Sequence, residues 1–342
     1  MEFKGITFTD DKYCNISFAT TAANTSLTQL AATGANWVSV IVTQYQETAN
    51  STDVFAVQSP IFGSYYTYIT ATDDSLRIAV QRAHALGLSV MLKPQVDLLN
   101  DSAHWRGNIG DGFTPAQWDA WFKSYGDMLL RYATLAQQER VEMLAVSTEL
   151  IAACLQPPKA RWLALLRAVR GVYAGQLTNA ANWGGEETGL TWWDAVDIIG
   201  VDAYYPLDVP ASATVPQLID AWQPVVLKLA NLSSFWQRPV LFTEIGYCST
   251  DCKRSPVPAT PSDLAFQARR YEAVMTAFRS QQWHRGFFWW AWSTDPGSGG
   301  EHDRCITPAY KPAEQVLRTF YGGSSAPLPS QPPVPPTCPC TV

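Results

Sequence analysis

The sequence has few histidines and no pattern typical of a metal site. Its four histidines are His84, His104, His284 and His302, and no two of them have a ligand spacing such as H-x-x-x-H. A G-x-S-x-G turn is missing, which argues against a Ser-His-Asp hydrolase. No Gly-rich phosphate motif follows the first predicted strand, so a dinucleotide-binding fold is not favoured. We therefore expect neither a metal ion nor an organic cofactor.

Basic clusters and long apolar runs are also missing. The 342 residues include 24 Lys and Arg and 30 Asp and Glu, which gives a net charge of −6. Because a nucleic-acid-binding surface concentrates positive charge, nucleic acid is not an expected partner. No apolar run has the length needed to span a membrane, so we expect no membrane partner. No interaction stripe stands out, and the expected state is a monomer.

Aromatic residues, by contrast, are abundant. The chain contains 14 Trp, 14 Tyr and 14 Phe. Tryptophan faces stack on the apolar faces of sugars, but they also fill protein cores, so this composition alone favours a carbohydrate ligand only weakly. A hydrophobic content of 47% is enough to bury the core of one large domain.

Two features concern the compartment. Five of the nine asparagines lie in N-x-[ST] sequons, namely Asn15, Asn24, Asn50, Asn100 and Asn231. This predicts a secreted, extracellular glycoprotein, and the alternative is unmodified surface asparagines. Among seven cysteines, Cys248 and Cys252 are close enough in sequence to close a small loop.

The C-terminal segment differs in composition from the rest of the chain. From Gly322 onward it is rich in Pro and Ser and has no apolar period. We interpret residues 322–342 as a linker or a disordered tail, and residues 1–321 as a single catalytic domain.

Within the predicted domain, eight short apolar runs alternate with helical patterns. The runs are 3–8, 37–42, 88–93, 142–148, 177–181, 196–201, 238–243 and 286–291. The main helical segments are 74–86, 115–138, 158–174, 215–231 and 261–282, several opened by signals such as "TDD", "TPAQ" and "TPSD". Eight strand–helix units in about 320 residues predict an α/β fold of the (β/α)8 TIM-barrel type.

A glutamate directly follows the fourth run, and another directly follows the seventh. "AVSTEL" places Glu149, and "VLFTEIGY" places Glu244, directly after buried apolar residues. Strands 4 and 7 lie across the barrel mouth from each other, so these carboxyl groups could be separated by roughly the 5 to 5.5 Å of a retaining glycosidase. Either glutamate alone is better explained as a helix cap or an arginine partner. The pair favours catalysis.

Other strand ends also carry polar and aromatic side chains. We expect these residues to line a sugar-binding cleft: Lys93, Gln95, Asp97, Trp105, Asn182, Trp183, Asp202, Tyr204, Trp290 and Trp292. Tyr204 is further expected to hydrogen-bond the nucleophile and hold it ionised. Core packing is the alternative for each aromatic. Glu186 and Glu187 are interpreted as cap or surface charges.

A series of blocks in this order resembles glycoside hydrolase family 113, the β-mannanase-like members of clan A. The blocks are "LSVMLKPQVDL", "WRG", "STELIAA", "VRGVYAGQLTNAANWGG", "VDIIGVDAYYPL", "RPVLFTEIGYCS" and "RGFFWWAWSTD". The resemblance spans roughly residues 4 to 320. It implies a (β/α)8 barrel and retaining hydrolysis of β-linked mannan, with Glu149 as acid/base and Glu244 as nucleophile.

Two positions depart from that family's pattern. Ser147 stands where Gly is usual, and we expect little effect on the chemistry. Gln95 stands where His is usual, at an expected sugar contact, so the preferred sugar or linkage stays open.

The sequence thus predicts a retaining endo-β-mannanase that acts on β-1,4-mannan or glucomannan by double displacement. Three alternatives remain: a retaining β-glycanase acting on glucan, an enzyme for another β-mannan linkage, and a carbohydrate-binding barrel without catalysis.

Overall fold

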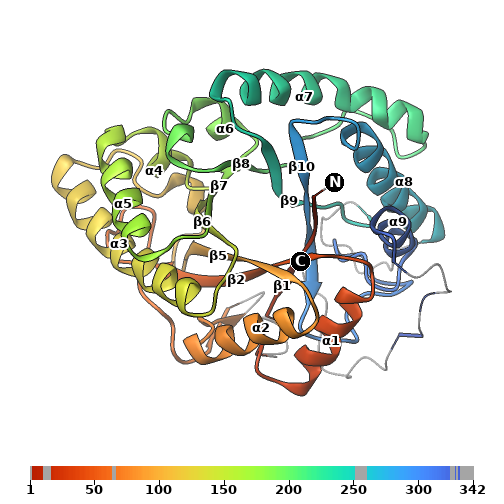
Figure 1. Ribbon diagram of the computed structural model, residues 1–342, viewed down its shortest axis with the longest axis horizontal. Helices are drawn as coiled ribbons and strands as arrows, with labels where there is room; N and C mark the ends of the chain where they lie inside the picture. The colour runs from red at the N-terminus through yellow and green to blue at the C-terminus, as the bar shows by residue number, and fades with distance from the viewer. Residues whose placement is uncertain are drawn as a thin grey trace.

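The protein is a barrel of eight parallel strands with helices around it, as Figure 1 shows. This computed structural model describes residues 2–10, 17–63, 67–250, 260–323, 328, 330 and 331. The strand order is β1-β2-β5-β6-β7-β8-β9-β10, and β10 pairs with β1 to close the ring. The predicted (β/α)8 barrel is confirmed.

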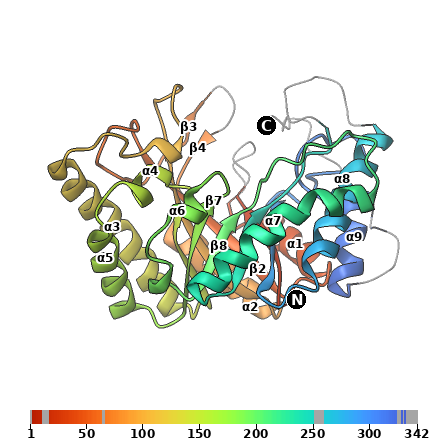
Figure 2. The ribbon, with the colours of Figure 1, turned by 90° about the horizontal axis from the view of Figure 1, so that it is seen from above.

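The barrel strands are β1 (Phe3–Thr9), β2 (Trp37–Gln46), β5 (Ser89–Leu98), β6 (Met143–Thr148), β7 (Gln176–Asn182), β8 (Ile198–Asp202), β9 (Val240–Ile245) and β10 (His284–Ser293). All eight predicted runs fall on them, although β2 and β5 extend four and five residues further. A short hairpin of β3 (Ile61–Phe62) and β4 (Thr67–Tyr68) follows β2. In Figure 2 this hairpin lies at the upper edge of the molecule.

The helices are α1 (Thr21–Ala31), α2 (Asp73–Ala85), α3 (Pro115–Gln138), α4 (Ile151–Leu155), α5 (Lys159–Val172), α6 (Glu186–Gly189), α7 (Val215–Trp236), α8 (Pro261–Phe278) and α9 (Pro312–Tyr321), with short 3-10 turns at Arg106–Asn108 and Trp193–Ala195. The five predicted helices correspond to α2, α3, α5, α7 and α8. Their start signals act as expected: Thr72, Thr114 and Thr260 accept hydrogen bonds from the first helical turn. Among the described helices, none is long and apolar enough to cross a membrane.

The barrel interior changes from apolar to charged along its axis. Its lower layer consists of Phe3, Met91, Met143, Ile198, Leu241 and Phe288, all buried. Because side chains alternate along a strand, residues two and four positions further point to the same interior. From Met91 this gives Lys93 and Gln95, and from Ile198 it gives Gly200 and Asp202. The carboxyl ends of the strands therefore place polar groups above an apolar floor.

The last residue of α9 contacts β1 at the edge where the barrel closes. The Tyr321 hydroxyl donates to the Gly5 carbonyl at 3.1 Å, and Lys4 Nζ donates to the Tyr321 carbonyl at 2.8 Å. Most of the predicted 322–342 tail lies outside the described residues. Gln331, which is described, donates to the carbonyls of Gly297 and Gly299 at 2.8 and 2.9 Å. The division of the chain at residue 321 stays a prediction.

Candidate active site

Glu149 and Glu244 lie at the carboxyl ends of the fourth and seventh barrel strands. Glu149 directly follows β6, has a left-handed φ of 52°, and its N–H donates to the Ala180 carbonyl at 2.8 Å. Non-glycine residues seldom adopt this conformation, and it occurs often at functional sites. Glu244 is inside β9 and only 5% exposed. Both carboxylates are thus held by the barrel rather than by a long loop.

Glu244 is held from two sides by groups of other strands. The ammonium group of Lys93, on β5, donates to Glu244 Oε1, and the Tyr204 hydroxyl donates to Oε2 at 2.9 Å. Lys93 Nζ also lies 3.1 Å from both oxygens of Asp202. Thr243 Oγ1 donates to Asp202 Oδ1 at 2.7 Å. Glu244 therefore belongs to a buried network of two carboxylates and one ammonium.

The ammonium group of Lys93 attracts both carboxylates of this network, whereas Asp202 and Glu244 repel each other. Burial, followed by the charge of Glu244, raises the pKa of Asp202 well above its ordinary value, and Lys93 acts in the opposite direction. Burial by itself lowers the pKa of Lys93, but the carboxylates of Asp202 and Glu244 raise it above the ordinary value, so Lys93 stays charged. Burial and the nearby Glu244 carboxylate raise the pKa of Tyr204 well above its usual range, so its hydroxyl keeps the proton that it donates. We predicted Lys93 and Asp202 as sugar contacts, but both are fully buried and bind protein groups instead.

The surroundings of Glu149 favour its protonated form. Burial, followed by the negative charge of Glu244, raises the pKa of Glu149. Arg106, Lys93 and a hydrogen bond from Asn182 act in the opposite direction. That bond runs from Asn182 Nδ2 to Glu149 Oε1 over 3.1 Å. The predicted site residue Asn182 thus contacts Glu149 directly.

Gln95 and Asp97 bind Arg106, the cation of the "WRG" block, which was not among the predicted sugar contacts. Arg106 Nη1 donates to Gln95 Oε1 at 2.8 Å, and Arg106 Nη2 lies 2.8 Å from Asp97 Oδ1. Gln95 Nε2 also donates to Thr43 Oγ1 at 2.9 Å. Gln95 is buried, so in this structure it holds Arg106 rather than facing the cleft. Gln95 and Asp97 thus orient the guanidinium group of Arg106, and the charge of this group lowers the pKa of Glu149.

The four predicted tryptophans have different environments. Trp105 is 44% exposed, Trp183 is half-buried against Tyr205 with ring centroids 5.7 Å apart, and Trp290 is half-buried. The Trp290–Ala291 peptide bond is cis. Gly246, two residues after Glu244, passes so close to Trp290 that a Cβ atom there would lie 2.5 Å from the Trp290 carbonyl oxygen. These three tryptophans retain surface for a ligand.

Trp292 was predicted as a stacking surface, and the structure places it in the core. It is 2% exposed, and its indole N–H donates to Ser26 Oγ, in α1, at 3.0 Å. The register of β1 and β10 shifts between Ile6 and Phe8, opposite this part of β10. This irregularity turns Trp292 outward although it is two positions from Trp290.

We predicted Glu186 and Glu187 as cap or surface charges. The surface alternative is wrong, because both are fully buried, but both lie in the first turn of α6, next to its N-cap residue Gly185. Glu186 accepts hydrogen bonds from the Asn182 N–H at 2.9 Å and from Asn179 Nδ2 at 3.3 Å. Glu187 accepts from the Gly185 N–H at 2.8 Å, from the Tyr205 hydroxyl at 3.2 Å and from Lys228. Local donors compensate for the loss of water at each carboxylate.

A model of Glycoside Hydrolase Family 113 matches residues 7–303, which is most of the chain and includes both glutamates. The chain belongs to glycoside hydrolase family 113. It is therefore a glycoside hydrolase. Among curated proteins, none matches it.

Solved structures agree with this family 113 assignment. A GH113 beta-1,4-mannanase, solved as a complex, is 27% identical, with a TM-score of 0.78 over 95% of this chain and 100% of that one. The GH113 beta-mannanase AaManA from Alicyclobacillus acidocaldarius, in complex with ManMIm, is 30% identical, with a TM-score of 0.76 over 94% of this chain and 97% of that one. A β-glucuronidase from Ruminococcus gnavus, 14% identical, shares only the fold, with a TM-score of 0.62 over 94% of this chain and 50% of that one.

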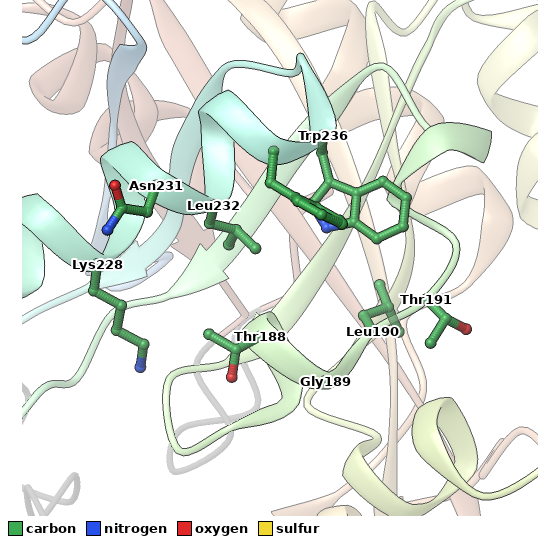
Figure 3. Close-up of a pocket in the computed structure, with 9 residues that line it drawn as sticks. Thr188, Gly189, Leu190, Thr191, Lys228, Asn231, Leu232 and Trp236 are labelled. Atoms are coloured by element: carbon green, nitrogen blue, oxygen red, sulfur yellow. The ribbon is translucent and has the colours of Figure 1, made fainter.

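This family 113 hydrolase also has a surface groove of about 560 Å³ that neither catalytic candidate lines. It lies between α7 and the turn that ends α6, as Figure 3 shows. Its lining residues are Thr188, Gly189, Leu190, Thr191, Lys228, Asn231, Leu232, Phe235 and Trp236. Among the described residues of the enzyme, no group of three or more His, Cys, Asp or Glu side chains could hold a metal ion.

Proposed function

We propose that this family 113 hydrolase is a retaining endo-β-mannanase that cleaves β-1,4-mannan and glucomannan. The similar solved structures carry the names β-1,4-mannanase and β-mannanase, which supports this substrate class. The exposed Trp105 and the half-buried Trp183 and Trp290 provide faces for uncharged sugar rings.

The first step forms a covalent intermediate. Ionised Glu244 attacks the anomeric carbon, and a bond from its carboxylate oxygen to that carbon replaces the glycosidic bond. Glu149 gives its proton to the departing glycosidic oxygen. Lys93 and Tyr204 hold the Glu244 carboxylate in place for this attack.

The second step releases the sugar. Esterification removes the negative charge of Glu244, and that charge is one of the causes that raise the pKa of Glu149. The pKa of Glu149 therefore falls in the intermediate, and its carboxylate can take a proton from an incoming water. The water oxygen bonds to the anomeric carbon, and Glu244 leaves as a carboxylate.

One observation carries the proposal: the two carboxylates at the mouth have opposite surroundings. Glu244 receives two direct donors, one of them an ammonium, whereas Glu149 receives a single neutral amide and has a raised pKa. A nucleophile must be ionised and a general acid protonated at the same pH.

The proposal is tested by following reducing-sugar release from β-1,4-mannan, glucomannan and β-glucan, with the anomeric configuration of the first product recorded by NMR. We expect mannan cleavage with retention in the wild type and loss of activity in Glu244→Ala. Cleavage of glucan alone would make the enzyme a β-glucanase. An inverted first product would exclude double displacement.

The acid/base assignment has its own test. We expect Glu149→Ala to lose at least about 10³-fold in kcat on mannan, because leaving-group protonation is lost. Added azide should restore turnover of a dinitrophenyl β-mannoside, whose leaving group needs no proton, and yield a β-mannosyl azide. Full activity of Glu149→Ala on mannan would contradict the assignment.

We also propose that the protein is secreted and glycosylated. The described sequon asparagines Asn24, Asn50, Asn100 and Asn231 are all exposed, whereas Asn15 lies outside the described residues. Cys248 is in a disulfide bond, which fits an oxidising compartment. A mass shift after N-glycosidase treatment of the protein from its natural source would support this, and an unchanged mass would contradict glycosylation.

A further inference from the structure

The buried carboxylate of Glu186 is connected to Glu149 through Asn182 and takes no part in the two proposed steps. Glu186 is the first residue of α6 and is fully buried, without an ionic partner among its hydrogen bonds in the described chain. Burying a carboxylate is costly unless its bonds serve the fold or the chemistry. Its position thus needs an explanation.

The hydrogen bonds of Glu186 lead directly to Glu149. Glu186 Oε2 accepts from the N–H of Asn182 at 2.9 Å, and the side-chain amide of the same Asn182 donates to Glu149 Oε1 at 3.1 Å. Asn182 Oδ1 accepts from the Gly184 N–H at 2.8 Å, which fixes the orientation of the amide group. Asn182 therefore has its backbone held by one glutamate while its side chain holds the other.

Further bonds fix Glu186 itself. Its Oε1 accepts from Asn179 Nδ2 at 3.3 Å, and the Cys154 thiol also donates to the carboxylate. Ser147 Oγ donates to Asn179 Oδ1 and lies 3.4 Å from Cys154 Sγ. Ser147 is one of the two departures from the family pattern noted above. Its hydroxyl gives this chain an additional link between β6, β7 and α4.

We propose that Glu186 is a positioning residue for glycosidic-bond cleavage: its carboxylate fixes Asn182, and Asn182 in turn holds the acid/base Glu149. This inference rests on the proposed role of Glu149 and goes beyond it, because Glu186 acts only through Asn182.

The charge of Glu186 adds a second effect. Burial raises the pKa of Glu186 to about 7, against the hydrogen bonds from Asn182, Cys154 and Asn179, and the charge of Glu149 adds to the increase. The titratable groups that face it are Glu149, Cys154 and Tyr125. Since the interaction between two charges is mutual, ionised Glu186 favours the protonated form of Glu149.

Two variants separate positioning from charge. Glu186→Ala removes the acceptor for Asn182, whereas Glu186→Gln keeps a carbonyl oxygen and removes the charge. The matched control is Glu187→Gln, since Glu187 is equally buried but its bonds lead to Lys228 and Tyr205. Each is assayed on two aryl β-mannobiosides, one with a dinitrophenyl and one with a phenyl leaving group.

The leaving group decides the outcome, because only the phenyl substrate needs the proton of Glu149. We expect Glu186→Ala to lower kcat/KM by about 10- to 100-fold on the phenyl substrate and by less than about threefold on the dinitrophenyl one. Glu186→Gln should move the alkaline limb of the kcat/KM profile to lower pH. Glu187→Gln should affect both substrates equally.

Equal losses on both substrates in the two Glu186 variants would show a merely structural role and overturn the proposal, as would wild-type values on both. If Glu186→Ala does not fold, the pH profile and the substrate ratio of Glu186→Gln decide. If the wild type is inactive on mannosides, only the mannanase proposal is contradicted. The phenyl and dinitrophenyl substrates are then made with the sugar that the wild type cleaves.

Discussion

Lys93 links two buried carboxylates of the barrel interior. It is fully buried on β5, and its ammonium group binds both Asp202 and Glu244. A lone buried charge is very unfavourable, so each member of this trio depends on the others. The same contacts that stabilise the barrel interior therefore orient Glu244, the proposed nucleophile.

Removing the ammonium should cost both stability and activity. We expect Lys93→Met to lower the free energy of unfolding by about 3 to 5 kcal/mol, because two carboxylates are left unpaired in the barrel. The double variant Lys93→Met/Asp202→Asn should recover part of the loss. Urea unfolding measures the stability of the single and of the double variant. The control is Lys123→Met, in the exposed Lys123–Asp127 pair, whose stability should stay unchanged. A wild-type midpoint for Lys93→Met would contradict the trio's role.

Tyr204 offers a milder change at the same carboxylate. Tyr204→Phe removes one donor to Glu244 and leaves Lys93 in place, so we expect kcat/KM to fall by about 10- to 100-fold with a nearly unchanged melting temperature. Tyr205→Phe is the matched control, since that hydroxyl donates to Glu187. Equal losses in both variants would disprove a specific role for the Tyr204 hydroxyl.

At the scale of elements, the strands and capped helices were predictable, whereas several partners of the site residues were not. Buried parallel strands leave apolar runs, and Thr-Pro starts mark helices, so both signals are local. Lys93 instead pairs with residues 109 and 151 positions away. The outward turn of Trp292 depends on a register shift that leaves no mark in its own strand. The "WRG" block did contain Arg106, but a sequence gives no sign of what a cation will bind.

The capping box of α3 should contribute to stability without affecting catalysis. Thr114 accepts from the Gln117 N–H, and Gln117 accepts from the Thr114 N–H in return. We expect Thr114→Ala to lower the unfolding free energy by about 1 kcal/mol, which is a shift of roughly 2 °C in melting temperature, at constant kcat. Thr134→Ala, on the exposed face of the same helix, serves as the control in a thermal scan. A loss of activity would show that α3 influences the mouth.

For the whole molecule, His284 at the lower end of β10 should determine part of the acid sensitivity. Burial lowers the pKa of His284 from 6.5 to about 3, because Phe242, Phe278 and Phe287 surround the ring. Below pH 6.5 the unfolded chain binds a proton that the folded protein rejects. The free energy of unfolding should therefore fall as the pH drops from about 6.5 toward 3, by roughly 4 kcal/mol from this residue.

His284→Phe removes that titration and keeps an aromatic ring in the cluster. Denaturant unfolding at pH 7, 5 and 4 should show a smaller decrease in the variant than in the wild type. Parallel curves for the two proteins would mean that other groups govern the acid response.

The pairing of β1 with β10 has a consequence for how the cell makes this protein. Thr9 ends the first strand and His284 opens the last, so 274 residues must be translated between them. At about 5 to 20 residues per second, β1 leaves the ribosome roughly 15 to 55 s before its second neighbour exists. Throughout that interval β1, with its apolar residues Phe3, Ile6 and Phe8, can pair with β2 but not with β10. We therefore expect chaperones to bind the nascent chain.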